Sequence, residues 1–295
     1  MMQSDDLAAT SIRPRRSVLY MPGANARALD KARELPCDAI IFDLEDAVAA
    51  DAKAVARDQV VAAVSHGGYG YRELVVRVNA LDTPWGADDV RAVAGLPVQG
   101  LLFPKVETTA QIDRLLAVVD AAGGQRLPLW FMVETPQGVL DIRDLALRTR
   151  RLSCLVMGTS DLVKELRARH TESRVNIAYA LQHCVLVARA CSLDILDGVH
   201  LDFRNQVSFR SACEQARAIG FDGKTLIHPT QVDLANEVFG YDAEAVAQAR
   251  AVLAAWEAAQ AEGKGVAVLD GKLIENLHAA EAQRTLAFAE ALSIR

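Results

Sequence analysis

The chain has 295 residues, of which 51% are hydrophobic and 24% charged, a composition typical of a soluble globular protein with one large domain or two ordinary ones. Its net charge of −6 excludes a general nucleic-acid-binding or membrane-binding surface. The five cysteines are scattered and form no C-x-x-C pair, which argues against a disulfide framework or a zinc site and fits a reducing cytoplasm.

Residues 1–13 are expected to form a flexible leader. The stretch from Met1 to Arg16 is polar and ends in a basic run, without the apolar core that a signal peptide needs. Apolar runs elsewhere in the chain are shorter than the roughly 20 residues that cross a bilayer. No membrane segment is therefore expected.

Eight short apolar runs follow the leader. Their near-continuous hydrophobicity predicts strands that are buried on both faces, as in a parallel sheet covered by helices. The runs are SVLYM (17–21), AIIFDLE (39–45), LVVRVN (74–79), GLLFPK (100–105), LWFMVE (129–134), CLVMG (154–158), ILDGV (195–199) and KTLIHP (224–229).

Stretches of helical period separate these runs and are long enough for crossover helices. We expect helices over 26–34, 52–64, 109–122, 139–149, 177–190 and 207–218. Eight alternating units predict an α/β fold of the (β/α)₈ TIM-barrel type over residues 14–235. No glycine-rich dinucleotide or phosphate-loop motif follows the first run, which argues against an open doubly wound sheet.

Residues 236–295 have a different pattern. An Ala/Glu/Gln-rich helix is expected over 243–261, followed by the glycine-punctuated GKGVAVLDGKL (263–273) and a second helix through Leu292. Because no ninth strand unit occurs, this segment cannot extend the barrel. We predict a C-terminal helical arm or lid.

Charged residues end several predicted strands, where the loops of such a barrel converge and its working residues lie. Glu134 follows the fifth run and Asp161 the sixth, so both carboxylates reach one rim. A single acid there often only caps the next helix. Two oxygen ligands suit Mg²⁺, which completes its octahedron with water and substrate oxygens. The second, third and fourth runs end in Asp43, Glu45, Asp46, Arg77, Asn79, Lys105 and Glu107.

Arg77 lies inside the apolar strand VVRVN, where an unpaired charge would be costly. One interpretation is a buried ion pair with Asp43, Glu45 or Asp46. The other is a guanidinium that faces a carboxylate or enolate oxygen of a substrate. The two interpretations are compatible.

Arg27 and Lys31 are four residues apart after the first run, on one face of the expected helix. They form either an ordinary solvated surface or a phosphate clamp, which an acidic protein would need in order to hold a polyphosphate ligand.

Other kinds of active site lack support. The six histidines form no H-x-H or H-E-x-x-H pattern, so zinc hydrolysis is not expected. His228 could line the barrel mouth or be a hydrogen-bonded structural histidine. There is no G-x-S-x-G elbow, and no cysteine–histidine arrangement in the sequence identifies a nucleophile, which argues against covalent catalysis.

Taken in order, the segments SVLYMPGANARALDKA, IIFDLEDAV, VVRVN, FPKVET, VETPQG, MGTSDL, DGKTLIHPTQV and DGKLIE resemble the citrate lyase β-subunit-like (CitE-like) branch of the HpcH/HpaI aldolase family. The resemblance covers nearly the whole chain after residue 13. It implies a (β/α)₈ barrel with a C-terminal arm, a homotrimer or hexamer, and Mg²⁺ (or Mn²⁺) chemistry on a carbon–carbon bond of a 3-hydroxyacyl-CoA thioester.

The resemblance also implies roles for particular residues. Glu134 and Asp161 match the acids that hold the metal, and Arg77 matches an arginine at the α-keto acid oxygen. Glu45 and Asp46 match a motif that supports the metal waters and this arginine. Arg27 and Lys31 match residues that approach the coenzyme A phosphates. The backbone of Gly158, Thr159 and Ser160 matches the segment that receives the substrate carboxylate.

The tail departs from the family pattern. Many relatives have a DGKMID-P stretch whose last aspartate reaches a neighbouring subunit's site, whereas this chain has Glu275 there and lacks the proline. Because a misplacement of about 1 Å can cost on the order of a hundredfold in rate, reactions that use this carboxylate, thioester hydrolysis above all, are in question.

The expected function is therefore Mg²⁺-dependent cleavage of malyl-CoA or citramalyl-CoA into acetyl-CoA and an α-keto acid. Glu275 is the candidate for proton transfer at the acetyl carbon. Three alternatives stay open: an acyl-CoA thioesterase on the same scaffold, the cleaving β-subunit of a citrate lyase complex, and a non-catalytic CoA-binding barrel. The sequence does not identify the keto acid.

Overall fold

The computed structural model describes residues 12–295; residues 1–11 of the expected leader lie outside the described part. The chain divides into two compact units. One is Arg15–Phe239, and the other contains Gly240–Arg295 together with residues 12–14. No helix in the described part is both long and apolar enough to cross a membrane.

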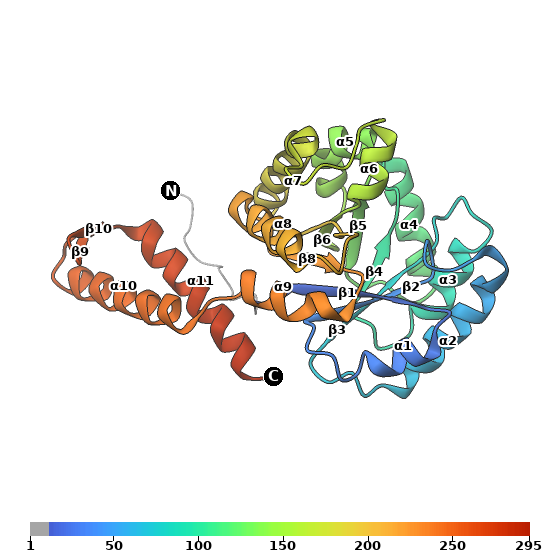
Figure 1. The fold of residues 1–295 in the computed structure, drawn as a ribbon, viewed down its shortest axis with the longest axis horizontal. Helices are drawn as coiled ribbons and strands as arrows, with labels where there is room; N and C mark the ends of the chain where they lie inside the picture. The colour runs from blue at the N-terminus through green and yellow to red at the C-terminus, as the bar shows by residue number, and fades with distance from the viewer. Residues whose placement is uncertain (1–11) are drawn as a thin grey trace. The chain divides into compact units, whose positions relative to one another are not determined.

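Eight parallel strands close into a barrel in the unit Arg15–Phe239 (Figure 1). Each strand pairs with the next in the chain, and β1 (Ser17–Pro22) pairs with β8 (Gly223–Leu226), which closes the ring. The predicted (β/α)₈ barrel is confirmed. The other strands are β2 (Ala39–Asp43), β3 (Glu73–Arg77), β4 (Gly100–Phe103), β5 (Leu129–Val133), β6 (Leu152–Met157) and β7 (Asp194–Asp197).

Helices alternate with these strands and surround the barrel (Figure 1). They are α1 (Ala26–Lys31), α2 (Lys53–His66), α3 (Gly86–Val93), α4 (Thr109–Ala121), α5 (Pro136–Leu147), α6 (Thr159–Glu165), α7 (Ala178–Ala190), α8 (Gln206–Ile219) and α9 (Val232–Val238). Short 3₁₀ turns cover Ala50–Ala52, Val175–Ile177 and Pro229–Gln231.

Burial on both faces explains why the strands are apolar without alternation. Outward side chains such as Leu19, Ile40 and Val76 pack against the helices, and inward ones such as Ile41, Trp130 and Met132 fill the barrel. At the end where the strands begin, Arg15 bonds Glu73 through Nε and Nη2 (2.7 and 2.8 Å) and stacks on Trp130. This buried cluster closes the floor.

Three barrel helices were not expected from the sequence. α3, α6 and α9 have eight, seven and seven residues, too few to show a helical period in a window of about 11–18 residues. The predicted strand ends also extend too far: β2 ends at Asp43, so Glu45 belongs to the loop. The charged residues that follow the strands are therefore on βα loops.

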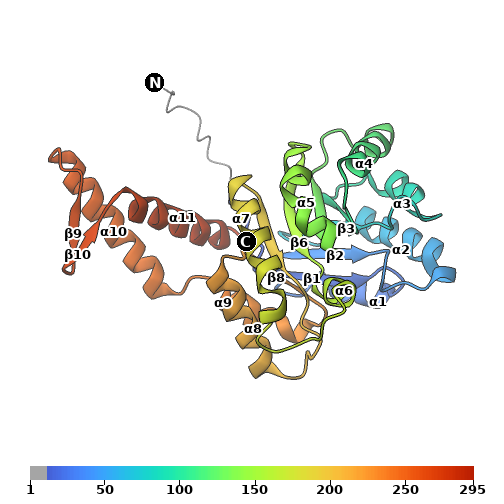
Figure 2. The same cartoon turned by 90° about the horizontal axis from the view of Figure 1, so that it is seen from above.

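The second unit contains two long helices, α10 (Ala243–Ala261) and α11 (Asn276–Ser293), joined by an antiparallel hairpin (Figure 2). The hairpin strands are β9 (Ala267–Leu269) and β10 (Lys272–Ile274). Asp270 and Gly271 both have positive φ, which a two-residue type I′ turn requires. The Asp-Gly pair was the sequence signal for this hairpin, which was not among the predicted elements.

Candidate functional site

A cavity of about 290 Å³ lies at the end of the barrel where the strands finish. Its walls come from the ends of β1, β2, β3, β5 and β6 and from the first turn of α6, so residues far apart in sequence share one space. Most of the residues predicted to carry chemistry are among them. The lining includes Tyr20, Asp43, Asp46, Arg77, Met132, Glu134, Gly158, Thr159, Ser160 and Asp161.

Glu134 directly follows β5 and is only 2% exposed. The backbone N–H of Lys105 donates a hydrogen bond to its Oε1 (2.9 Å). Lys105 has a φ of 51°, a left-handed conformation that is costly for a side-chain-bearing residue and is typically kept at functional sites. The β4–α4 loop thus holds Glu134 in one orientation.

Burial and the negative charges of Glu45 and Asp161 raise the pKa of Glu134 to about 8, although Arg77 and the Lys105 N–H act in the opposite direction. Glu134 and Asp161 line the same cavity, and the negative charge of Asp161 disfavours the charged form of Glu134. A buried group in this environment is stabilised in its charged form by a cation.

Gly158 leaves the space beside Glu134 open. A Cβ at this position would lie 2.4 Å from the Glu134 Cβ and 2.6 Å from its Oε2. No side chain fits there without moving the carboxylate. Gly158 is the N-cap of α6, whose first turn carries Asp161, so the same turn brings the second carboxylate to the cavity.

The residues fit a hard divalent cation with few protein ligands. Within residues 12–295, no group of three or more His, Cys, Asp or Glu side chains is arranged to hold a metal. Glu134 and Asp161 can provide two oxygen ligands, and the buried excess of negative charge around Glu134 favours a cation. Mg²⁺ characteristically takes one or two carboxylates and retains water or ligand oxygens.

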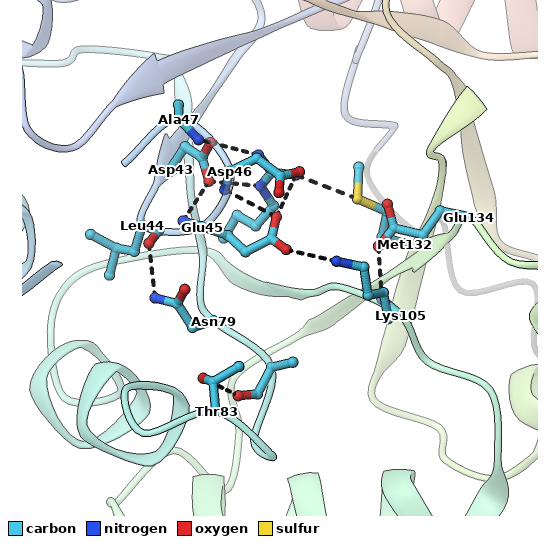
Figure 3. A network of polar contacts seen from close by, with 12 residues as sticks. Asp43, Leu44, Glu45, Asp46, Ala47, Asn79, Thr83, Lys105, Met132 and Glu134 are labelled. Carbon is cyan, nitrogen blue, oxygen red and sulfur yellow. Dashed lines mark hydrogen bonds and ion pairs between the residues drawn. The ribbon is translucent and has the colours of Figure 1, made fainter. Parts of the chain in front are cut away.

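Arg77 ends β3 and contacts three acids, Asp43, Glu45 and Asp46. Figure 3 labels these acids. Its Nε and Nη2 bond the two oxygens of Asp43 (2.7 and 2.5 Å), and its Nη1 lies 3.0 Å from Glu45 and 3.2 Å from Asp46. The predicted buried ion pair therefore exists with Asp43 and Glu45, and the third acid, Asp46, pairs with Arg77 from an exposed position. Arg77 also lines the cavity, so the second interpretation, contact with a ligand, is compatible with this pairing.

A buried lysine supports the loop that carries Glu45 and Asp46. Lys53 Nζ donates to the carbonyls of Leu44 (2.9 Å) and Glu45 (2.7 Å) and to Oδ1 of Asn79 (2.7 Å). The Asn79 amide donates to the Leu44 carbonyl (2.8 Å). Asn79, a candidate at the end of the third run, therefore positions this loop and is not in the cavity lining.

The other predicted residues are distributed unevenly. Thr159 and Ser160 line the cavity, whereas Arg27 and Lys31 are exposed on α1. Glu275 is the exposed N-cap residue of α11 in the second unit, and its backbone N–H donates to His278 Nδ1 (3.0 Å). Their roles remain predictions.

His228 has the contacts of a structural histidine. Its ring stacks on Phe203 with centroids 4.5 Å apart, and Nδ1 bonds Thr230 Oγ1 (2.9 Å).

A neighbouring cavity of about 310 Å³ shares Asp161 with the first one. Lys105, Arg114 and Lys164 contribute positive charge to its walls, and Glu107 and Glu165 contribute negative charge. This space was not predicted from the sequence.

Two further features were missed. Tyr20 lines the first cavity, but nothing in SVLYMP distinguishes its hydroxyl from ordinary strand packing. Asp197, at the end of β7, is fully buried and pairs with Lys224 of β8. Arg174 Nη1 also donates to both carboxylate oxygens of Asp197, at 2.8 Å. A lysine within the short strand GKTL was the available signal for this ion-pair network.

Comparisons with known proteins show which proteins the chain is similar to. The family model described as HpcH/HpaI aldolase/citrate lyase matches residues 16–229. A (3S)-malyl-CoA thioesterase of Cereibacter sphaeroides is 48% identical over 280 residues, which cover 95% of this chain and 96% of that protein. The citrate lyase subunit beta of Escherichia coli K12 is 34% identical over 300 residues, with 100% and 99% covered.

Among solved structures, CitE from Mycobacterium tuberculosis in complex with magnesium, acetoacetate and coenzyme A aligns with a TM-score of 0.75 and 27% identity. The alignment covers 94% of this chain and 98% of that one.

Proposed function

Because the chain belongs to the HpcH/HpaI aldolase/citrate lyase family, we propose that it is a Mg²⁺-dependent enzyme that cleaves a carbon–carbon bond in a 3-hydroxyacyl-CoA such as malyl-CoA or citramalyl-CoA. The observation that carries this proposal is the single cavity that contains Glu134, Asp161 and Arg77. The magnesium and coenzyme A in the complex of the CitE neighbour support the choice of cofactor and substrate class.

Glu134 and Asp161 would hold the metal, with Mn²⁺ as an alternative to Mg²⁺. When bound, the ion supplies a Lewis acid that orients the 2-hydroxy carboxylate and makes its hydroxyl more acidic. The backbone of Gly158, Thr159 and Ser160 is proposed to receive the substrate carboxylate.

In the proposed reaction, the hydroxyl proton passes to water that the Glu45–Asp46 pair is proposed to orient, and the carbonyl of the keto acid forms. The bond between the hydroxyl carbon and the carbon next to the thioester breaks, and its electron pair becomes the enolate of acetyl-CoA. A proton then returns to that carbon, with Glu275 of a neighbouring subunit as the proposed donor. The products are acetyl-CoA and glyoxylate from malyl-CoA, or pyruvate from citramalyl-CoA.

Arg77 is proposed to stabilise the oxygen on which negative charge develops. Its bonds to Asp43, Glu45 and Asp46 fix the guanidinium, so little reorganisation is needed during the reaction. Removal of one such preorganised donor typically costs about 3–4 kcal/mol of transition-state stabilisation. Arg77→Met should therefore reduce kcat by on the order of a hundredfold or more.

The test is a product analysis. Purified protein with Mg²⁺ is incubated with malyl-CoA, citramalyl-CoA and their methylated analogues, and α-keto acid and free CoA are scored separately. Keto acid and acetyl-CoA in equal amounts are the expected products. If the wild type produces neither α-keto acid nor free CoA from any of these substrates, the proposed reaction class is contradicted.

Thioester hydrolysis is the second candidate, because the relative that is 48% identical is named a (3S)-malyl-CoA thioesterase. In that reaction, water attacks the thioester carbon, and the products are free CoA and the intact hydroxy acid. The same assay distinguishes the two reactions, because only cleavage of the carbon–carbon bond produces a keto acid.

Two other functions have distinct signatures. A citrate lyase β-subunit, as in the relative from Escherichia coli, would copurify with other subunits of a citrate lyase complex. A non-catalytic module would bind CoA without turning over any acyl thioester. A homotrimer or hexamer is the proposed assembly for the free-standing enzyme.

A further inference from the structure

The hydroxyl of Tyr20 is a buried polar group without a hydrogen-bond partner among the described residues. Tyr20 is 9% exposed, and its ring belongs to the inward-facing cluster that fills the barrel with Ile41 and Met132. A buried hydroxyl left unpaired costs on the order of 1–3 kcal/mol, and the large majority of such groups are paired. A partner for this hydroxyl is therefore expected from outside the chain.

The position of Tyr20 identifies where that partner lies. Tyr20 lines the same cavity as Glu134, Asp161 and Arg77. The Cζ of Arg77 lies over the Tyr20 ring, 4.8 Å from its centroid, so the ring and the guanidinium are direct neighbours. Burial raises the pKa of Tyr20, against the opposing effect of Arg77, so the hydroxyl is protonated at neutral pH and is a donor.

We propose that Tyr20 is a further catalytic residue, whose hydroxyl donates a hydrogen bond to the substrate oxygen that gains negative charge beside Arg77. This inference rests on the proposed action on an acyl-CoA thioester. It holds for both candidate reactions, because carbon–carbon cleavage produces an enolate oxygen and hydrolysis produces a tetrahedral oxyanion. The charged guanidinium of Arg77 and the neutral hydroxyl of Tyr20 then both donate hydrogen bonds to the oxygen that gains negative charge.

Tyr20→Phe removes only the hydroxyl and keeps the ring that packs in the barrel and supports Arg77. Because the lost group has no partner in the protein, the melting temperature of the metal-free variant should be unchanged or slightly higher. With Mg²⁺ and malyl-CoA, kcat/KM should fall about 10- to 100-fold, the effect of one hydrogen bond to a charged group. The affinity for oxaloacetate with Mg²⁺, used as a keto acid probe in calorimetry, should also fall.

Tyr69→Phe is the matched control. Tyr69 is also buried under an arginine, with the Cζ of Arg33 4.8 Å from its ring centroid, but its hydroxyl donates to the Leu29 carbonyl (3.1 Å). It precedes β3, at the opposite end of the barrel from the cavity. The melting temperature of this variant should fall by about 2–4 °C for each kcal/mol of hydrogen-bond free energy that is lost. Its kcat/KM should be unchanged.

The two variants should thus show opposite patterns. The inference is overturned if Tyr20→Phe loses as much thermal stability as Tyr69→Phe, or if it has wild-type kcat/KM and wild-type affinity for oxaloacetate. If the wild type turns over no thioester, the proposed function fails, and the oxaloacetate titration decides the role of Tyr20. Weaker binding by Tyr20→Phe then supports it, and equal binding or no binding by both proteins contradicts it.

Discussion

At the scale of single residues, the site depends on carboxylates that are forced together. Glu134 is held by the Lys105 N–H and repelled by Glu45 and Asp161, so the protein keeps it in a position that is unfavourable without a cation. Such an arrangement stores free energy that metal binding can release. In a barrel that binds no cation, the repulsion between these carboxylates would only destabilise the fold.

Asp161→Asn should weaken Mg²⁺ binding, because it replaces one of the two proposed carboxylate ligands with a neutral amide. We expect the Mg²⁺ concentration for half-maximal activity to rise at least about tenfold, equivalent to about 1.4 kcal/mol. Glu165→Gln is the control, because Glu165 is an exposed acid four residues later on the same helix. Equal Mg²⁺ requirements in the two variants would argue against Asp161 as a ligand.

Gly158→Ala should remove most activity without unfolding the protein. The added Cβ would meet the Glu134 side chain at 2.4 Å, so the carboxylate must shift, and a shift of about 1 Å typically costs on the order of a hundredfold in rate. Gly95→Ala adds a methyl where nothing lies within 4 Å and should leave the rate unchanged. Activity measured beside far-UV circular dichroism checks both variants; a fully active Gly158→Ala would contradict the close approach.

At the scale of elements, buried ion pairs hold the last two strands together. Asp197 of β7 bonds Lys224 of β8 and Arg174, which lies in the connection between β6 and α7. Burial opposes the charge on Asp197, but the charges of Lys224 and Arg174 outweigh it and leave its pKa below the usual range. The network therefore stabilises the barrel as long as Asp197 is ionised.

Asp197→Asn should cost about 3–5 kcal/mol in the free energy of unfolding at pH 7, because it leaves Lys224 buried without its counter-charge. The pKa of Asp197 is depressed in the folded state, so its contribution is complete above the unfolded value of about 3.9 and is lost as the pH falls through the folded value. Denaturant unfolding measured from pH 7 to pH 3 gives the free energy of unfolding of both proteins. The difference in this free energy between wild type and variant should become smaller below about pH 4. A constant difference across that range would refute the assignment.

Much of the element order could be predicted from sequence, because strands buried on two faces leave long apolar runs. The short helices could not, since seven residues in α6 hold about two turns and little periodicity. Glu134, Asp161 and Arg77 could be singled out because charges stand out after apolar strands. Tyr20 could not, because only its lack of a partner in three dimensions marks it. The Asp-Gly pair of the β9–β10 hairpin was visible in the sequence and was missed.

At the scale of the whole molecule, the proposed function requires an acidic chain to bind the phosphates of a coenzyme A thioester. Two pairs of cations in the unit Arg15–Phe239 are candidates for this contact. Arg27 and Lys31 lie exposed on α1, and Arg114 and Lys164 line the cavity that shares Asp161. The first pair is the proposed phosphate site.

A double variant at each pair tests this assignment. Arg27→Ala with Lys31→Ala should raise KM for malyl-CoA about 10-fold, the effect of about 1.4 kcal/mol of lost binding, and leave kcat nearly unchanged. Its effect should diminish at high salt, because exposed charges are screened. Arg114→Ala with Lys164→Ala should leave KM within a factor of two. A reversed result would assign the phosphates to the neighbouring cavity.

The central claim is that Glu134 and Asp161 form one divalent metal site in the barrel cavity. Calorimetric titration of metal-free protein with Mn²⁺, followed by competition with Mg²⁺, tests it most directly. The wild type should bind one ion per chain, and Glu134→Gln should lose that binding while keeping the wild-type circular dichroism spectrum. Wild-type stoichiometry and affinity in a folded Glu134→Gln variant would contradict the claim.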